Sequence, residues 1–211
     1  MKKNISLYSI LLFLIPAITL LICLQIHVIF YELNSIPFID GKVSVSLIGR
    51  QEKTILIFRS GLFLYAVISI LFYFNISNFL LSKKIKNKFK ILGFLANLFL
   101  CIYLFALGKQ DFYYETSRRI SIIFFILIMY INHIYLVRVL NLLRSRIKVI
   151  YRKILIVIIL LMTVLVIIGT PWVNPLFGYP NQLKNIVEWN LFLLTILFYI
   201  PIWHLFLNLR N

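Results

Sequence analysis

The sequence predicts an all-helical integral membrane protein with six transmembrane helices. Of its 211 residues, 62% are hydrophobic and only 13% are charged, which is too much apolar surface for a water-soluble core. The apolar residues gather in six runs, each about long enough to cross a hydrocarbon core of roughly 30 Å. The runs show no in-out alternation of a barrel strand, so they are predicted to be helices. Residues 1–211 are treated as one transmembrane domain.

The six runs follow one another with mostly short connections. They are Leu7–Tyr31, Thr54–Leu81, Ile91–Leu107, Ile120–Leu142, Ile154–Thr170 and Ile186–Asn208. The start, Met1-Lys2-Lys3, resembles a signal peptide, but no small-x-small cleavage site follows, so an uncleaved first helix is expected. Pro16 and Pro201 fall inside the first and sixth helices, where they predict kinks.

The distribution of charge predicts the orientation. With the N-terminus inside, 14 of the 22 lysines and arginines face the cytoplasm, and all six acids face the other side. The largest basic groups, Lys83–Lys90 and Arg144–Lys153, each connect two apolar runs, which is a topology signal and excludes nucleic acid as a partner. Both termini are therefore expected in the cytoplasm, and a bacterial inner membrane or another cell membrane is the expected location.

The longest connection, Ile36–Arg59, lies outside between the first two helices. A polar connection of this length is more often functional than idle. Ser44 and Ser46 alternate with apolar residues, a period of two that predicts a short extended segment. Neither serine has a base nearby in the sequence, so hydrogen bonding in the loop fits them better than nucleophilic catalysis.

Two ionisable residues, Arg59 and Glu188, fall at a similar outer depth in the second and sixth helices. A charge in lipid is costly, so each is expected to have a partner. One interpretation is a structural ion pair between the two helices. Another makes the pair the base of a headgroup site, and a third lets each side chain reach the interface alone.

Further polar residues gather on the same outer side. Arg118 and Arg119 open the fourth helix, and His27 and Glu32 close the first. With Lys42, Arg50 and Lys53 they could bind a phosphate, because guanidinium groups offer forked donors to anionic oxygens. The simpler interpretation is that these charges anchor helix ends at the interface.

No metal or cofactor is expected. Cys23 and Cys101 lie in apolar runs, and the depths of His133 and His204 do not match well enough for shared haem ligation, so both histidines are interpreted as hydrogen-bonded packing residues. The sequence has no zinc-ligand spacing, phosphate loop or nucleophile elbow. The asparagines expected to bond across helices are Asn75, Asn78, Asn97, Asn132 and Asn190.

Several short motifs lie in the outer segment and at the start of the sixth helix: Ser44-Val45-Ser46, Gly49, Glu52, Phe58-Arg59, Glu188-Trp189 and Phe198-Tyr199. In these motifs the chain resembles the DRAM/FRAG/SFK family of six-helix membrane proteins. Gln51 stands where the family tends to have proline, and Ser117-Arg118-Arg119 stands where members commonly carry a histidine. The resemblance implies a role connected with lipids, since relatives include autophagy modulators and GPI-anchor lipid-remodelling factors.

These observations lead to a hypothesis of function. The protein is expected to recognise or help remodel a lipid headgroup at the outer leaflet, with Arg59 and Glu188 at the base of the site and Ser44, Ser46 and Glu52 in its lid. In an enzyme, Glu188 would be the general base. The alternatives are an accessory subunit that binds a membrane-protein partner, and a small-molecule transporter, although the sequence shows neither clear mid-membrane charges nor inverted repeats.

Overall fold

The computed structural model describes residues 2–31, 36–80, 83–142, 149–169 and 180–208, and all of its regular structure is helical. The helices are α1 (Lys2–Tyr31), α2 (Pro37–Asp40), α3 (Val45–Gly49), α4 (Ile55–Leu80), α5 (Lys83–Ala106), α6 (Phe112–Leu142), α7 (Val149–Ile168), α8 (Pro180–Leu197) and α9 (Tyr199–Asn208). Six segments are long and apolar enough to cross a membrane, with α8 and α9 counted as one. The predicted all-helical class and the six candidate spans are therefore confirmed.

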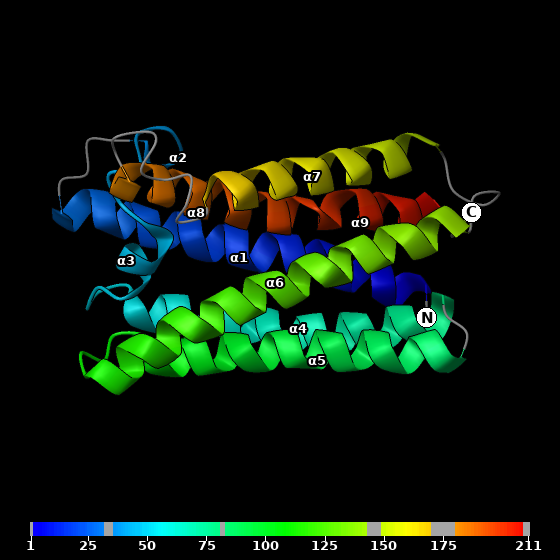
Figure 1. Cartoon of the computed structure of the whole chain (residues 1–211), viewed down its shortest axis with the longest axis horizontal. Helices are drawn as coiled ribbons and strands as arrows, with labels where there is room; N and C mark the ends of the chain where they lie inside the picture. Colours follow the sequence, from blue (N-terminus) through cyan, green and yellow to red (C-terminus); the bar gives the residue numbers. More distant parts are fainter. Residues whose placement is uncertain (1, 32–35, 81–82, 143–148, 170–179, 209–211) are drawn as a thin grey trace.

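The long helices lie side by side along one axis (Figure 1). Helix α1 packs against α4 and α9, and α5 packs between α4 and α6. Helix α1 begins and α9 ends at the same end of the bundle, which we call the terminal end. Helices α2 and α3 and the turn between α5 and α6 lie at the other end, which we call the loop end. Every residue proposed below as part of a site lies toward the loop end.

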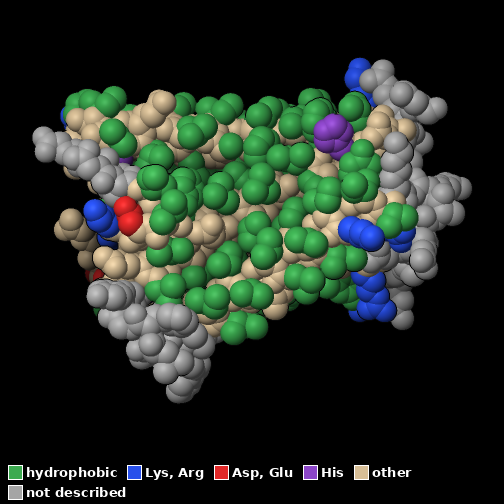
Figure 2. All heavy atoms as spheres, turned by 90° about the horizontal axis from the view of Figure 1, so that it is seen from above, with side chains coloured by type: hydrophobic (Ala, Val, Ile, Leu, Met, Phe, Trp, Pro, Cys, Tyr) green, Lys and Arg blue, Asp and Glu red, His purple; other side chains and the backbone are tan. Residues whose placement is uncertain are grey.

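The surface between the two ends is apolar. On the face that Figure 2 shows, hydrophobic side chains cover the middle, lysine and arginine lie at both ends, and acidic side chains lie toward the loop end. Large apolar residues point outward, among them Leu56, which is 75% exposed, and Phe105, which is 65% exposed. A water-soluble protein rarely exposes so many large apolar side chains, and a lipid-facing surface requires them.

The last span is interrupted where the sequence predicts a kink. Helix α8 ends at Leu197 and α9 begins at Tyr199. Pro201 has no N–H to donate to the carbonyl of Leu197, four residues earlier, so the helical ladder loses a bond at this point. Pro16 lies inside α1, which continues from Lys2 to Tyr31.

Close backbone approach joins α1 to α4. A Cβ atom at Gly61 would lie 2.8 Å from Cβ of Thr19, so only glycine fits at this crossing.

Polar side chains add fewer interhelical hydrogen bonds than the sequence predicts. Asn97 does donate to Ser69 Oγ of α4, at 2.9 Å, but Asn75 donates to Leu71 of its own helix, so its predicted bond across helices is wrong. The backbone carbonyl one turn earlier accepts from its side-chain amide.

The two histidines of the terminal half differ in environment. His133 is fully buried, stacks on Phe198 with ring centroids 3.9 Å apart, and has Nε2 3.5 Å from the hydroxyl oxygen of Tyr199. His204 is exposed and lies beside Trp203. The packing role is thus seen for His133, whereas the same prediction for His204 is wrong because its side chain lies on the surface of α9.

Candidate functional site

One face of α8 holds the polar segment 38–46 through side chains that bind its backbone. Asn185 Nδ2 donates to Gly41 O at 2.8 Å, Glu188 Oε1 accepts from Ser46 N at 2.9 Å, Trp189 Nε1 donates to Val43 O at 2.8 Å, and Asn190 Nδ2 donates to Phe38 O at 3.1 Å. Asn185, Glu188 and Trp189 are three and four residues apart and so lie on one face of α8, and Asn190 follows about 100° further round the helix. The segment is therefore fixed to the bundle.

The two serines of this segment belong to a short helix and its cap. Ser44 is the N-cap of α3, and its Oγ accepts from Leu47 N at 3.0 Å and lies 3.2 Å from Ser46 Oγ. The prediction of a short extended segment at this point is wrong, because Val45–Gly49 form α3. The inward residues are Val45 and Ile48, which are three apart and so share a helix face, whereas the alternation covers too few residues to distinguish the two periods.

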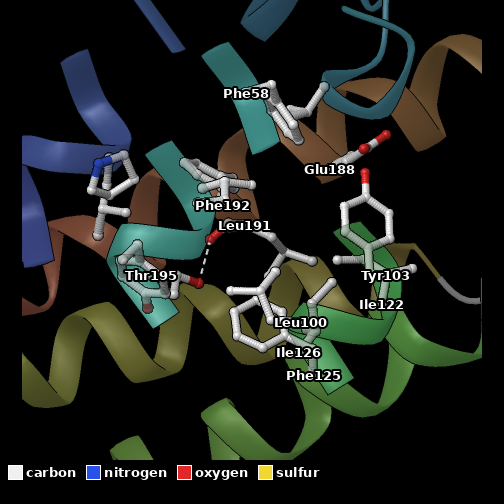
Figure 3. Close-up of a pocket in the computed structure, with 15 residues that line it drawn as sticks. Phe58, Leu100, Tyr103, Ile122, Phe125, Ile126, Glu188, Leu191, Phe192 and Thr195 are labelled. Carbon is white, nitrogen blue, oxygen red and sulfur yellow. Dashed lines mark hydrogen bonds between the residues drawn. The ribbon is translucent and has the colours of Figure 1, made fainter. Parts of the chain in front are cut away.

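Glu188 lines an apolar cavity inside the loop end of the bundle (Figure 3). The described residues that line it include Phe58, Tyr103, Phe125, Leu191 and Glu188, and Glu188 is the only charged one among them. The volume is about 60 Å³, measured as the space open to the centre of a water molecule. That is room for a few small groups. The hydroxyl of Tyr103 points toward the carboxylate (Figure 3).

The expected ion pair between Arg59 and Glu188 is not formed, and that prediction is wrong. Arg59 Nη2 donates to the carbonyl of Leu107, while Glu188 bonds Ser46. Among the residues that the structure describes, only Glu115 and Arg119 form an ion pair. The reason is rotation about α4: Phe58 faces the cavity of Glu188, and one residue later, about 100° further round the helix, Arg59 faces the end of α5.

A basic pocket opens at the surface of the loop end. It has a volume of about 280 Å³ and is lined by Arg50, Gly108, Lys109, Gln110, Glu115 and Arg118. Gly108 has φ of 80°, a conformation that favours glycine, and this turn brings Lys109 to the pocket. Arg119 is not among the lining residues because it extends along α6 to pair with Glu115.

An apolar groove lies beside the basic pocket on the surface between α4 and α5. Its volume is about 440 Å³, and its lining residues are Arg59, Ser60, Phe63, Cys101, Leu104, Phe105 and Lys109. Phe63 and Phe105 are 56% and 65% exposed, so this groove belongs to the apolar surface between the two ends of the bundle. Lys109 belongs to both linings, and its Nζ lies 3.8 Å from the ring centroid of Phe105. The basic pocket and the apolar groove therefore share a wall, and the ammonium group of Lys109 lies in it.

Tyr103 connects the cavity to the basic pocket electrostatically. Arg50, Arg118 and Glu188 all lie close enough to its hydroxyl to interact with it. Arg50 is also close enough to interact with Glu188. Three ionisable side chains from different parts of the chain therefore lie near one buried hydroxyl. They come from α6, from α8 and from the residue after α3, and the hydroxyl belongs to α5.

Other residues predicted for the site do not line any of these three spaces; they are His27, Lys42, Ser44, Ser46, Glu52 and Lys53. His27 is buried, and its Nδ1 lies 2.6 Å from Gln51 Oε1. Glu52 is exposed at the surface of the loop end. Glu32 lies outside the described residues. The structure adds Tyr103 and Lys109, which the sequence analysis missed; the one available signal was the Gly108-Lys109 turn between Phe105 and Tyr114.

Comparison with known proteins gives no family for this chain. No protein-family model, no curated protein and no solved structure matches it. The resemblance to the DRAM/FRAG/SFK family therefore stays a prediction. The geometry of the loop end is the only basis for assigning a function.

Proposed function

We propose that this is an integral membrane protein that recognises the phosphate-bearing headgroup of a membrane lipid at its loop end. The observation that carries the proposal is the wall shared by the basic pocket and the apolar groove. Lys109 lies in both linings, with Arg50 and Arg118 on the pocket side and Arg59 on the groove side. A lipid is a ligand with a charged head next to an apolar tail, and this arrangement complements both parts.

The chemistry of the lining favours a phosphate. Arg50 and Arg118 bear guanidinium groups, whose parallel donors match phosphate oxygens, and no ion pair between described residues occupies either of them. The neighbouring aromatic rings of Phe63 and Phe105 offer an acyl chain a surface that already faces lipid. A free phosphate would use the pocket alone, whereas a lipid would use the pocket and the groove together.

The proposed orientation puts the loop end outside. The clusters Lys83–Lys90 and Arg144–Lys153 would then lie in the cytoplasm, in agreement with the bias of basic residues toward inner loops. The lipid site would face the outer leaflet, in a bacterial inner membrane or another cell membrane. Binding requires no nucleophile or metal, and remodelling would require a catalytic group, for which Glu188 is the candidate.

The replacement Arg118→Gln tests the lipid site. It removes one forked donor to the phosphate, so we expect the retention of added phospholipid to fall about tenfold in native mass spectrometry of protein extracted in mild detergent. The matched control is Arg138→Gln, on the same helix but toward the terminal end and exposed. Equal losses in the two variants would contradict the proposal, and inorganic phosphate that competes fully with lipid would assign the pocket to the free ion.

Orientation can be measured with single cysteines at exposed lysines. In a background with Cys101→Ala, we expect Lys42→Cys to react with a membrane-impermeant maleimide on intact cells. Lys153→Cys is expected to react only after the membrane is permeabilised. Both lysines are exposed, and the remaining native thiol, Cys23, is fully buried, so it gives little background. The reverse labelling pattern would show that the loop end faces the cytoplasm.

A further inference from the structure

Glu188 is a carboxyl group in a candidate membrane span, and no ion pair with a described residue compensates it. Its Oε1 accepts one backbone N–H, from Ser46, and among the described residues no lysine or arginine lies within ion-pair distance of it. Lys184 and Arg50 interact with it only over a longer range. An ionisable group within a membrane span normally has a charged partner or a functional ligand.

The cationic side chains and the acidic side chain near Tyr103 line two different spaces. Arg50 and Arg118 line the basic pocket, Glu188 lines the cavity, and Arg118 lies one turn of α6 before Ile122, which also lines the cavity. The complement of this arrangement is a ligand that carries an anionic group and, a few bonds away, a cationic group. The cavity beside Glu188 is small, about 60 Å³, so the cationic group that fits it is compact.

We infer that the headgroup bound at the loop end is zwitterionic, with its phosphate on Arg50 and Arg118 and its ammonium group on Glu188. This rests on the proposed function and names the class of lipid: a phospholipid whose phosphate carries an aminoalkyl ester, such as phosphatidylethanolamine. The ammonium donates to the carboxylate, and a charge-assisted bond of this kind is about twice as strong as a neutral one. An anionic lipid without an amine, such as phosphatidylglycerol, satisfies only the arginines.

The inference is tested by competition between lipids. The protein is incubated with an equimolar mixture of phosphatidylethanolamine, phosphatidylcholine and phosphatidylglycerol of the same acyl chains, and retained lipids are counted by native mass spectrometry. The unaltered protein is expected to retain phosphatidylethanolamine about tenfold over phosphatidylglycerol. Phosphatidylcholine is expected between the two, because its trimethylammonium group cannot donate a hydrogen bond and is larger.

The variant Glu188→Gln separates this inference from the proposed function. The amide oxygen can still accept from Ser46 N, which preserves the bond between α8 and α3. The preference for phosphatidylethanolamine is expected to disappear, because an amide carries no charge to attract the ammonium group, while phosphatidylglycerol, which has no ammonium group, is still retained. Arg118→Gln is expected to weaken both. An unchanged preference in Glu188→Gln would overturn the inference and leave the proposed function intact. Unchanged binding of both lipids in Arg118→Gln would overturn the proposed function.

A second variant keeps the test usable if Glu188→Gln does not fold. Tyr103→Phe removes only the hydroxyl that points toward Glu188 and keeps the ring that lines the cavity. We expect the preference for phosphatidylethanolamine over phosphatidylglycerol to fall about threefold, because a polar group that points toward the Glu188 carboxyl group is lost. No change in that ratio would also count against the inference.

Discussion

Replacing Trp189 with alanine is expected to destabilise the protein by about 3–5 kcal/mol, the usual cost of removing a buried tryptophan. The indole is 1% exposed, packs edge-on against Phe38 with centroids 4.8 Å apart, and donates Nε1–H to the carbonyl of Val43 at 2.8 Å. Its loss leaves both a cavity and an unpaired carbonyl. Thermal denaturation in detergent should show a markedly lower midpoint, and limited proteolysis should cut in the segment 38–46.

Two controls define what Trp189 contributes. Trp189→Phe keeps most of the ring and loses the bond to Val43, so about 1–2 kcal/mol of destabilisation is expected. Trp203→Ala, on α9 and only half-buried, should cost less than Trp189→Ala and leave the segment 38–46 resistant to protease. If Trp189→Ala unfolded at the midpoint of the unaltered protein, the segment would not be held to α8 as described.

The second large effect is expected from Gly61→Leu, which should force α1 and α4 apart. A Cβ at this position would lie 2.6 Å from Thr19 Cγ2 and 2.8 Å from Thr19 Cβ. Thr19 Cβ is attached directly to the backbone of α1, so rotation of the side chain cannot relieve the contact. Overpacking of a close crossing typically costs about 1–3 kcal/mol, and leucine adds three further carbons to the clash.

Ser60→Leu is the matched control for Gly61→Leu. Ser60 is the preceding residue of α4 and is exposed, so the same leucine points toward lipid and should change the midpoint little. The two variants are compared by thermal denaturation and by size-exclusion chromatography. A Gly61→Leu protein as stable as Ser60→Leu would show that α1 and α4 do not meet at this glycine.

The sequence was sufficient for the helix class and the number of candidate spans, because run length and apolar content follow directly from the thickness of a bilayer. It was insufficient for the pairing of Arg59 with Glu188. Both residues lie toward the loop end of the bundle, but the position along a helix does not determine which side of the helix a residue faces. The direction of Arg59 depends on how α4 is rotated in the bundle, and Phe58 takes the inward direction.

Tyr103 and Lys109 could not be predicted as site residues from the sequence either. A tyrosine in an apolar run and a lysine after a glycine carry no signal of function by themselves. They become part of a site only because the α5–α6 turn lies beside Arg50, which is distant from both in the chain. Such proximity between distant residues comes from packing, and one sequence does not contain it.

The hydrogen bonds from α8 to the segment 38–46 limit the route by which a ligand could enter and leave the site. Because α8 binds that segment at four backbone groups, a ligand is not expected to enter by lifting it. The groove between α4 and α5 leaves a lateral route, so a lipid would arrive by diffusing within its own leaflet. Occupancy would then follow the mole fraction of that lipid in the bilayer and would be insensitive to its concentration in water.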